Sequence, residues 1–238
     1  MKRVLISLSL LLCTLFAFAQ EEERAFYPID WKQMDEVVKS NPDSVRTLVK
    51  RLTTVTLDKT LTYPERQLAF YGITYLSNNN KVQLLLMTAH ESLKTKDYDH
   101  ALNLTKEALE ENPLSLEGNK MMADIIRISL KDSTKTSPFT PEDREYYGNM
   151  MFRIMNTIAT TGYGSEEYPF AVTMVSDEYI FNGIYLFNGI YLEIETGSQY
   201  LLGKSYPCDK FDVKEKSKYF SADEIYFDIT RVFEIRRQ

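Results

Sequence analysis

The chain has 238 residues, of which 44% are apolar and 26% charged, with 28 Lys and Arg against 34 Asp and Glu. This composition is typical of a globular protein and excludes a collagen, a disulfide scaffold, a disordered chain and a protein with many membrane spans. The net negative charge and the lack of clustered Lys and Arg argue against nucleic acid as a partner.

Residues 1–19 have the layout of a secretory signal peptide. Basic residues 2–3 precede an apolar run over 4–19, which ends in the small-residue motif Ala17-Phe18-Ala19. We therefore expect an exported protein, periplasmic or secreted, that is cleaved after Ala19 and has no transmembrane segment after cleavage. A retained N-terminal anchor is the alternative. Cys13 follows Leu12 inside the apolar run, which does not fit a lipid-attachment motif.

Removal of residues 1–19 takes away Lys2 and Arg3 and leaves 26 basic against 34 acidic residues. Cys208 is then the one remaining cysteine, so an internal disulfide is excluded. We expect a buried, inert thiol, with an intermolecular bridge as the alternative. Arg231, Arg236 and Arg237 form a small basic end that we interpret as solubilising charge.

Residues 20–162 show helical spacing of apolar residues, and the clearest segment is 82–113. Val82, Leu86 and Ala89 begin one apolar stripe, and Ala101 and Ala108 belong to a second. Asp97 can cap the second helix and Pro113 ends it. The pattern predicts two antiparallel helices joined by a tight turn.

This hairpin resembles a tetratricopeptide repeat, with a chance amphipathic hairpin as the alternative. The residues that match the second helix of that family in register are Asp97, Tyr98, Ala101, Ala108, Leu109 and Pro113. A repeat needs neighbours to cover its faces. Leu116 starts a similar run 34 residues after Val82, and residues 141–159 are its expected partner.

Helices are also expected upstream. Asn41-Pro42 starts one helix, and Thr62 with Glu65 forms a capping-box signature for another. They could form an atypical first repeat, so the number of repeats stays open. We expect the single Trp, Trp31, to be a core anchor.

Residues 163–238 are rich in Tyr, Phe, Val and Ile, which favours strands. Short strands are expected near 169–175, 200–202, 211–213 and 225–229. The segment 181–186 is repeated as 187–192, and each copy contains Asn-Gly, so one copy is expected to form a hairpin and the other a bulge or bend. The predicted fold class is α+β, with N-terminal helical hairpins of tetratricopeptide type (20–162) and a small antiparallel β-rich C-terminal unit (163–238) packed on them.

The whole chain after residue 19 resembles a family of uncharacterised secreted proteins from Gram-negative gut bacteria, known as domain of unknown function 4919. The C-terminal motifs that carry the resemblance are Pro169-Phe170-x-Val172, Asp177-Glu178-Tyr179, Asp209-x-Phe211-x-Val213 and Ile225-Tyr226-Phe227-Asp228. The family has no established activity, so the resemblance implies no catalytic residues.

Catalytic and metal-binding motifs do not emerge from the sequence. His90 and His100 stand outside any zinc-binding pattern, and no nucleophile elbow or phosphate-binding loop is present. We therefore expect no catalytic site, no metal and no cofactor. A carboxylate-dependent hydrolase is the weaker alternative, and its candidate pairs are Asp177 with Glu178, Glu193 with Glu195, and Asp209 with Asp212.

The most plausible binding surface is the concave face of the helical hairpins. By register with the repeat, it would present Gln83, Leu86, His90, Lys94, Lys120, Asp124 and Arg127. Long polar side chains of this kind could hold an extended peptide or its terminal carboxylate. The alternative is a groove that is solvated or covered by the chain itself. We expect a non-catalytic module that binds a protein or peptide in the bacterial envelope. The alternative is carbohydrate binding through Tyr185, Tyr191 and Tyr200.

Overall fold

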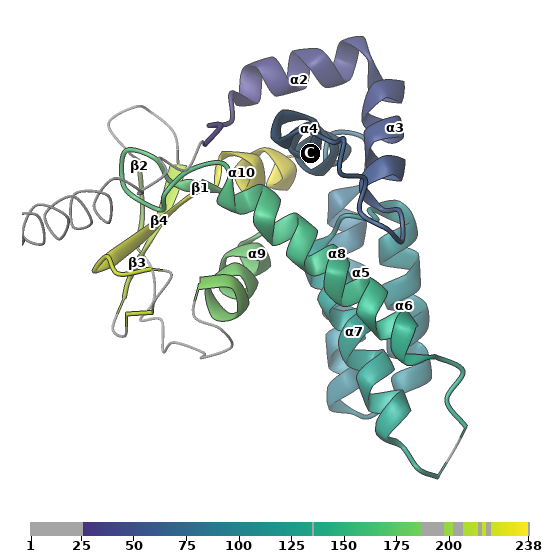
Figure 1. The fold of residues 1–238 in the computed structure, drawn as a ribbon. Helices are drawn as coiled ribbons and strands as arrows, with labels where there is room; N and C mark the ends of the chain where they lie inside the picture. The colour runs from purple at the N-terminus through teal and green to yellow at the C-terminus, as the bar shows by residue number, and fades with distance from the viewer. Residues whose placement is uncertain are drawn as a thin grey trace, which may run out of the picture.

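The computed structural model describes residues 26–134, 136–186, 198–201, 207–213, 216–217 and 220–237. The signal-peptide expectation, the second Phe-Asn-Gly-Ile-Tyr-Leu copy over 187–192, and Glu193 and Glu195 lie outside these residues. Within them the chain is mostly helical with one small mixed sheet, which confirms the α+β prediction (Figure 1). In the described ranges, no helix is long and apolar enough to cross a membrane.

From residue 26 to residue 162 the described residues form seven helices, and most of them begin where the sequence places a cap. They are α2 (Trp31–Ser40), α3 (Pro42–Leu52), α4 (Tyr63–Ile73), α5 (Asn79–Lys94), α6 (Tyr98–Glu111), α7 (Leu116–Lys131) and α8 (Pro141–Ala159). The side chains of Asp97 and Ser115 accept hydrogen bonds from the first turns of α6 and α7, and Thr62 forms the expected capping box with Glu65. These caps satisfy backbone N–H groups that otherwise lack partners.

The α5–α6 hairpin is present as predicted, and α7 packs against it. Val82, Leu86 and Ala89 of α5 form one buried cluster with Ala101 and Ala108 of α6 and with two residues of α7, Met121 and Ile125. Because three of these side chains are alanines with no exposed surface, the helix backbones can approach closely.

Helix α8 joins this group to the N-terminal helices. It packs against both α7 and α4. The neighbour of α4 is thus α8, whereas in a regular array of hairpins it would be α5. Arg153 of α8 fixes the contact, because its guanidinium donates to the carbonyl oxygens of Leu52, Thr54 and Val55 at the end of α3. The pair α3–α4 is therefore a neighbour of α8 and not the first unit of a regular array.

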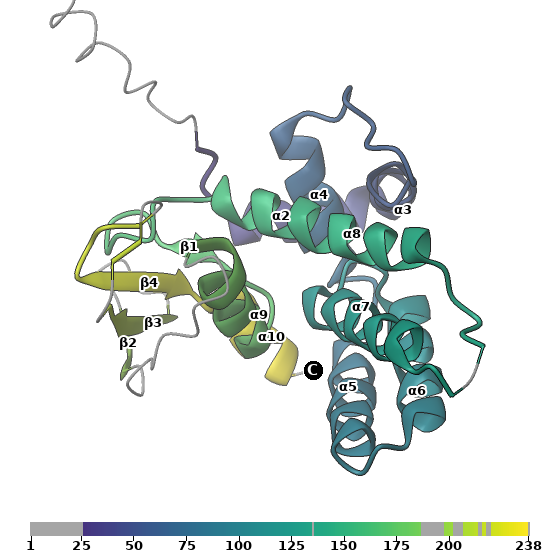
Figure 2. The same ribbon diagram turned by 60° about the horizontal axis from the view of Figure 1, so that its bottom comes forward.

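The sheet has strand order β1-β4-β3-β2, with β1 (Phe170–Ala171), β2 (Ser198–Leu201), β3 (Pro207–Asp212) and β4 (Glu224–Asp228). The pair β1–β4 is parallel and the other two pairs are antiparallel, so the sheet is mixed and not wholly antiparallel as predicted. Helices α9 (Val175–Ile180) and α10 (Thr230–Arg236) lie between the sheet and the α5–α7 group (Figure 2).

The expectation for residues 181–186 was wrong. The segment is neither a hairpin nor a bulge but a π-helical turn, η1 (Phe181–Leu186), that continues α9. Phe181 has no exposed surface and packs against Phe170 and Phe227, with ring centroids 4.9 and 6.3 Å apart. This tertiary packing overrides the local Asn-Gly turn preference.

The basic end also differs from its interpretation, because Arg231 is only 1% exposed. Its guanidinium donates to the hydroxyl and carbonyl oxygens of Thr74 and lies 3.5 Å from the ring centre of Tyr75. Arg231 therefore attaches α10 to the end of α4. Trp31 plays a similar part, because its indole N–H donates to Asp228 at 2.7 Å.

Candidate binding groove

Two adjoining hollows lie along α7, where the helical part faces α9 and η1. The cationic hollow is about 670 Å³, and three cations and two carboxylates line it together with apolar side chains: Lys120, Arg127, Arg144, Asp124, Glu145, Met151, Phe152 and Ile184. The apolar hollow is about 390 Å³ and is lined by Leu93, Met121, Tyr179, Ile180 and Ile184, with His90 at its α5 side. Lys120, Asp124 and Ile184 belong to both, so the two hollows form one continuous groove.

The structure brings four of the six predicted site residues to this groove. Lys120, Asp124 and Arg127 lie on one face of α7 because they are spaced by four and three residues, and His90 joins them from α5. Gln83 and Lys94 are exposed but line neither hollow, and Lys94 pairs with Glu91 at 2.8 Å. Leu86 faces the core instead, with 1% of its surface exposed.

The predicted open face is partly covered by the chain itself. Helix α9 packs against α7, and Tyr179, Ile180 and Ile184 of the α9–η1 segment supply the opposite wall of the groove. The surface is thus a channel between two parts of the chain and not the open hollow of a helical array. Helical periodicity did not indicate these three residues, because residues 163–238 were expected to be β-rich and Ile184 was expected to lie in a hairpin or a bend.

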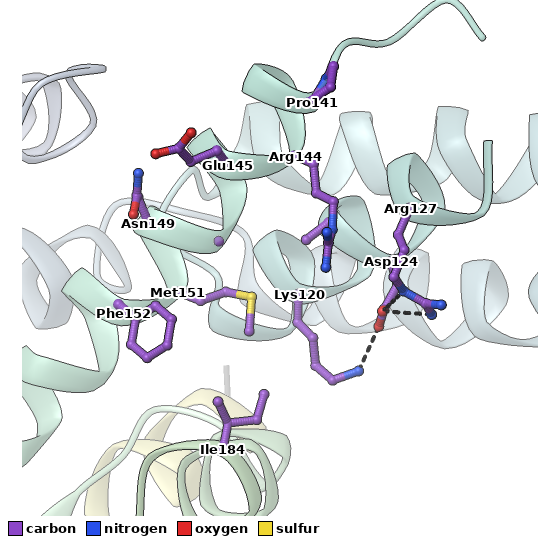
Figure 3. A pocket seen from close by; sticks show the side chains of 12 residues that line it. Lys120, Asp124, Arg127, Pro141, Arg144, Glu145, Asn149, Met151, Phe152 and Ile184 are labelled. Atoms are coloured by element: carbon purple, nitrogen blue, oxygen red, sulfur yellow. Dashed lines mark hydrogen bonds and ion pairs between the residues drawn. The ribbon is translucent and has the colours of Figure 1, made fainter. Parts of the chain in front are cut away.

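Asp124 is the electrostatic centre of the cationic hollow. Lys120 donates to one carboxylate oxygen at 2.9 Å and Arg127 to the other at 3.2 Å (Figure 3). Burial by itself would raise the pKa of Asp124, but the hydrogen bonds and charges of Lys120 and Arg127 outweigh it and lower the pKa. Asp124 therefore remains ionised at neutral pH.

Arg144 is a groove cation that the spacing of residues in the sequence did not indicate. It extends from α8 toward Lys120, Asp124 and Arg127 (Figure 3). Its guanidinium has no hydrogen bond or ion pair with any residue that the structure describes. The nearby Glu145 carboxylate points away from Asp124 in the same view.

The carboxylate pairs proposed for a hydrolase do not assemble in the groove. Asp212 is exposed and lies 3.8 Å from Lys210, whereas Asp209 is buried. Asp177 is buried as well, and its carboxylate accepts hydrogen bonds from the backbone and hydroxyl of Thr173 at the start of α9. Neither hollow is lined by Asp177, Glu178, Asp209 or Asp212.

The carboxyl group that does meet another is Glu178, which lies beside Asp209 of β3. Glu178 has no exposed surface, and apart from Asp209 no described residue gives its carboxyl a hydrogen bond. Burial, followed by the charge of Asp209 and the hydrogen bond with it, raises the pKa of Glu178 to about 10. Two adjacent carboxyl groups can share a hydrogen bond only when one of them is protonated.

Other candidate chemistry is also limited. Among the described residues, no group of three His, Cys, Asp or Glu side chains could hold a metal ion. Tyr185, one of the proposed sugar-binding tyrosines, is half-buried, stacks on Phe181 and donates its hydroxyl to Asn156. Tyr191 lies outside the described residues. Cys208 is buried and free, and burial raises the pKa of its thiol.

Comparison with known proteins identifies a family but no characterised relative. No curated protein and no solved structure matches the chain. Residues 32–238 match the family described as Domain of unknown function (DUF4919). The match extends from the second residue of α2 to the end of the chain and so includes both walls of the groove. The chain therefore belongs to the DUF4919 family.

Proposed function

We propose that the protein is an exported, non-catalytic module that binds a segment of a partner protein in the groove between α7–α8 and α9–η1. The observation that carries the proposal is the pair of connected hollows, one cationic and one apolar. Ligand grooves characteristically combine apolar walls with a few polar groups that fix orientation. An extended peptide suits an open channel because its side chains can enter both hollows while its backbone remains solvated.

The helical part is proposed to derive from tetratricopeptide-type hairpins. Support comes from the α5–α6 hairpin, from its three buried alanines, and from the 34-residue spacing in the sequence between Val82 of α5 and Leu116 of α7. The covering of α7 by α9 gives this protein a groove with two walls in place of a single concave face.

Export is proposed from the layout of residues 1–19. Cell fractionation followed by mass spectrometry of the purified protein tests it. A mature N-terminus at Gln20 in the periplasm or medium is the expected result, and a full-length chain retained in the cytoplasm would contradict it.

The binding proposal is tested by photo-crosslinking of the full mature chain in an envelope fraction. A benzophenone amino acid in place of Phe152, which is 52% exposed beside the cationic hollow, should give a discrete crosslinked protein. The charge reversal Lys120→Glu should abolish that crosslink, because it places a negative charge at the point where the hollows meet.

Lys94→Glu is the matched control, since it makes the same charge change at an exposed residue outside both hollows. The crosslink should persist in this variant. Equal crosslinking in wild type, Lys120→Glu and Lys94→Glu would exclude the groove as the binding surface.

A further inference from the structure

Gly148 of α8 leaves a gap in the wall of the cationic hollow. It lies in the interior of a 19-residue helix, where glycine is less favourable than alanine. Its φ is not positive, and a Cβ atom there would meet no neighbouring atom within 4 Å in the part of the chain that the structure describes. The open space belongs to the hollow. A glycine at such a place lets a ligand approach the helix backbone closely.

Arg144 and Phe152 flank this gap, about one helical turn before and after Gly148. Four residues of an α-helix advance about 6 Å, so a group above Gly148 is about 6 Å along the axis from either flank. Phe152 is 52% exposed although it is a large apolar residue. Its ring and the Arg144 side chain lie on opposite sides of Met151, which also lines the hollow (Figure 3). A cation, an aromatic ring and a thioether thus border the gap.

These three groups share a preference for aromatic rings. A guanidinium stacks on the face of a ring when it lies within about 6 Å of the ring centre. Two rings pair at centroid separations of about 4.5–7 Å, and a thioether sulfur makes favourable contacts with ring edges.

Net charge does not decide the occupant of the groove. The two hollows together contain three cations and three carboxylates, which are Lys120, Arg127, Arg144, Asp124, Glu145 and Glu117. The occupant is therefore inferred from the chemistry of the groups around Gly148 and is uncharged.

Building on the proposed function, we propose that the cationic hollow takes one aromatic side chain of the partner segment. Its ring lies over the backbone of Gly148, with Arg144 on one side and Phe152 on the other. Arg144 is available for this contact, because it has no hydrogen bond or ion pair with any residue that the structure describes. Glu145 does not compete for it, since consecutive residues of a helix do not face each other.

The test is a methyl NMR titration of the mature chain labelled at Met and Ile methyl groups, with the signals of Met151 and Ile184 as local probes. The first probe peptide, acetyl-Gly-Ser-Phe-Ser-Gly-amide, carries no charge. The second has cyclohexylalanine in place of Phe, which keeps the size and the apolar surface of the side chain but removes its π-electrons.

We expect the Phe peptide to shift both methyl signals and to bind about tenfold more tightly than the cyclohexylalanine peptide. This factor corresponds to about 1.4 kcal/mol, which one exposed cation–π contact and one ring pair together provide. Arg144→Gln and Phe152→Leu should each reduce the preference. Lys94→Gln, at an exposed residue outside both hollows, should keep it.

The variant Gly148→Leu separates binding from folding. Leu is a better helix former than Gly, and its side chain would fill the gap. The variant should therefore unfold at a higher urea concentration than the wild type and yet lose the shifts with the Phe peptide. Thr47→Leu puts the same side chain at an exposed position of α3 outside both hollows and should keep the shifts.

Equal affinity for the Phe and cyclohexylalanine peptides would overturn the inference and leave peptide binding itself intact. An absence of shifts with both peptides at millimolar concentration, or unchanged binding in Gly148→Leu, would also overturn it. None of these results decides whether a protein occupies the groove, because the Phe152 crosslink reports that separately.

Discussion

Replacing Glu178 with Gln should stabilise the protein, although it changes a fully buried residue. Wild-type Glu178 must keep its proton in the folded state, because its carboxyl is sealed against Asp209. In the unfolded chain the same group ionises with its ordinary pKa of 4.5. Folding at neutral pH therefore requires uptake of a proton, which costs free energy.

The size of this cost follows from the two pKa values. At pH 7 the unfolded group is about 2.5 pH units above its pKa while the folded group, with a pKa of about 10, remains protonated. At about 1.4 kcal/mol per unit, the penalty is about 3 kcal/mol. A Gln side chain has nearly the same shape, cannot ionise, and can donate its amide N–H to Asp209.

The sign of the pH dependence is equally defined. Below pH 4.5 both states hold the proton and the wild type has no penalty. As the pH rises above 4.5, the unfolded state loses the proton that the folded state keeps, so the unfolding free energy falls until the pH reaches the folded pKa. The advantage of Glu178→Gln should therefore be small at pH 5 and grow toward pH 9.

Urea unfolding monitored by Trp fluorescence at pH 5, 7 and 9 measures this effect. We expect the variant to exceed the wild type by ~1–3 kcal/mol at pH 7, less than the full penalty because the amide must also be buried. Glu110→Gln, at an exposed position on α6, is the control and should leave both stability and pH slope unchanged. Parallel wild-type and Glu178→Gln curves between pH 5 and 9 would refute the shared-proton reasoning.

Three further predictions address the helical part and the thiol. Arg153→Met should lower the unfolding free energy, measured by urea unfolding, by about 2–3 kcal/mol, because three buried or half-buried carbonyl oxygens lose their charged donor. A change below about 0.5 kcal/mol would show that the α3–α8 contact does not depend on Arg153. Ala108→Leu should cost about 1–3 kcal/mol in the same assay by overpacking the α5–α6 contact, whereas Leu84→Ala, at a 64% exposed position, should be nearly neutral. Cys208 should react with a thiol reagent only as fast as the chain unfolds, since it has no exposed surface and burial raises its pKa; rapid labelling of the native protein would place the thiol at the surface.

The positions of helices α3 to α8 were readable from the sequence because helix formation depends on neighbours three and four residues apart, whereas α9 and α10 lie in a part that was expected to be β-rich. The stripe of Val82, Leu86 and Ala89 and the cap at Asp97 are local signals, and the structure contains the hairpin they predict. The same periodicity placed Lys120, Asp124 and Arg127 on one face of α7. In the structure these three side chains line the cationic hollow, and their role in binding stays a prediction.

Contacts between distant segments decided the rest. Phe181 packs on Phe170 and Phe227, and this favours a π-helical turn over the hairpin that Asn-Gly suggests locally. Arg231 was expected in solvent but is buried, and its guanidinium donates a hydrogen bond to Thr74, 157 residues away in the chain. The energy of such contacts depends on which surfaces meet, and no periodicity within one segment encodes that.

The groove shows the division most clearly. Periodicity alone determined which α7 side chains share a face, whereas only tertiary packing brought Arg144 from α8 and Ile184 from η1 to the same place. The pairing of Glu178 with Asp209 likewise arises where α9 meets β3. The conformation of a helix depends on residues close to one another in the sequence. A binding site depends on which side chains from different elements are buried together and on their charges, and these contacts form only when the chain has folded.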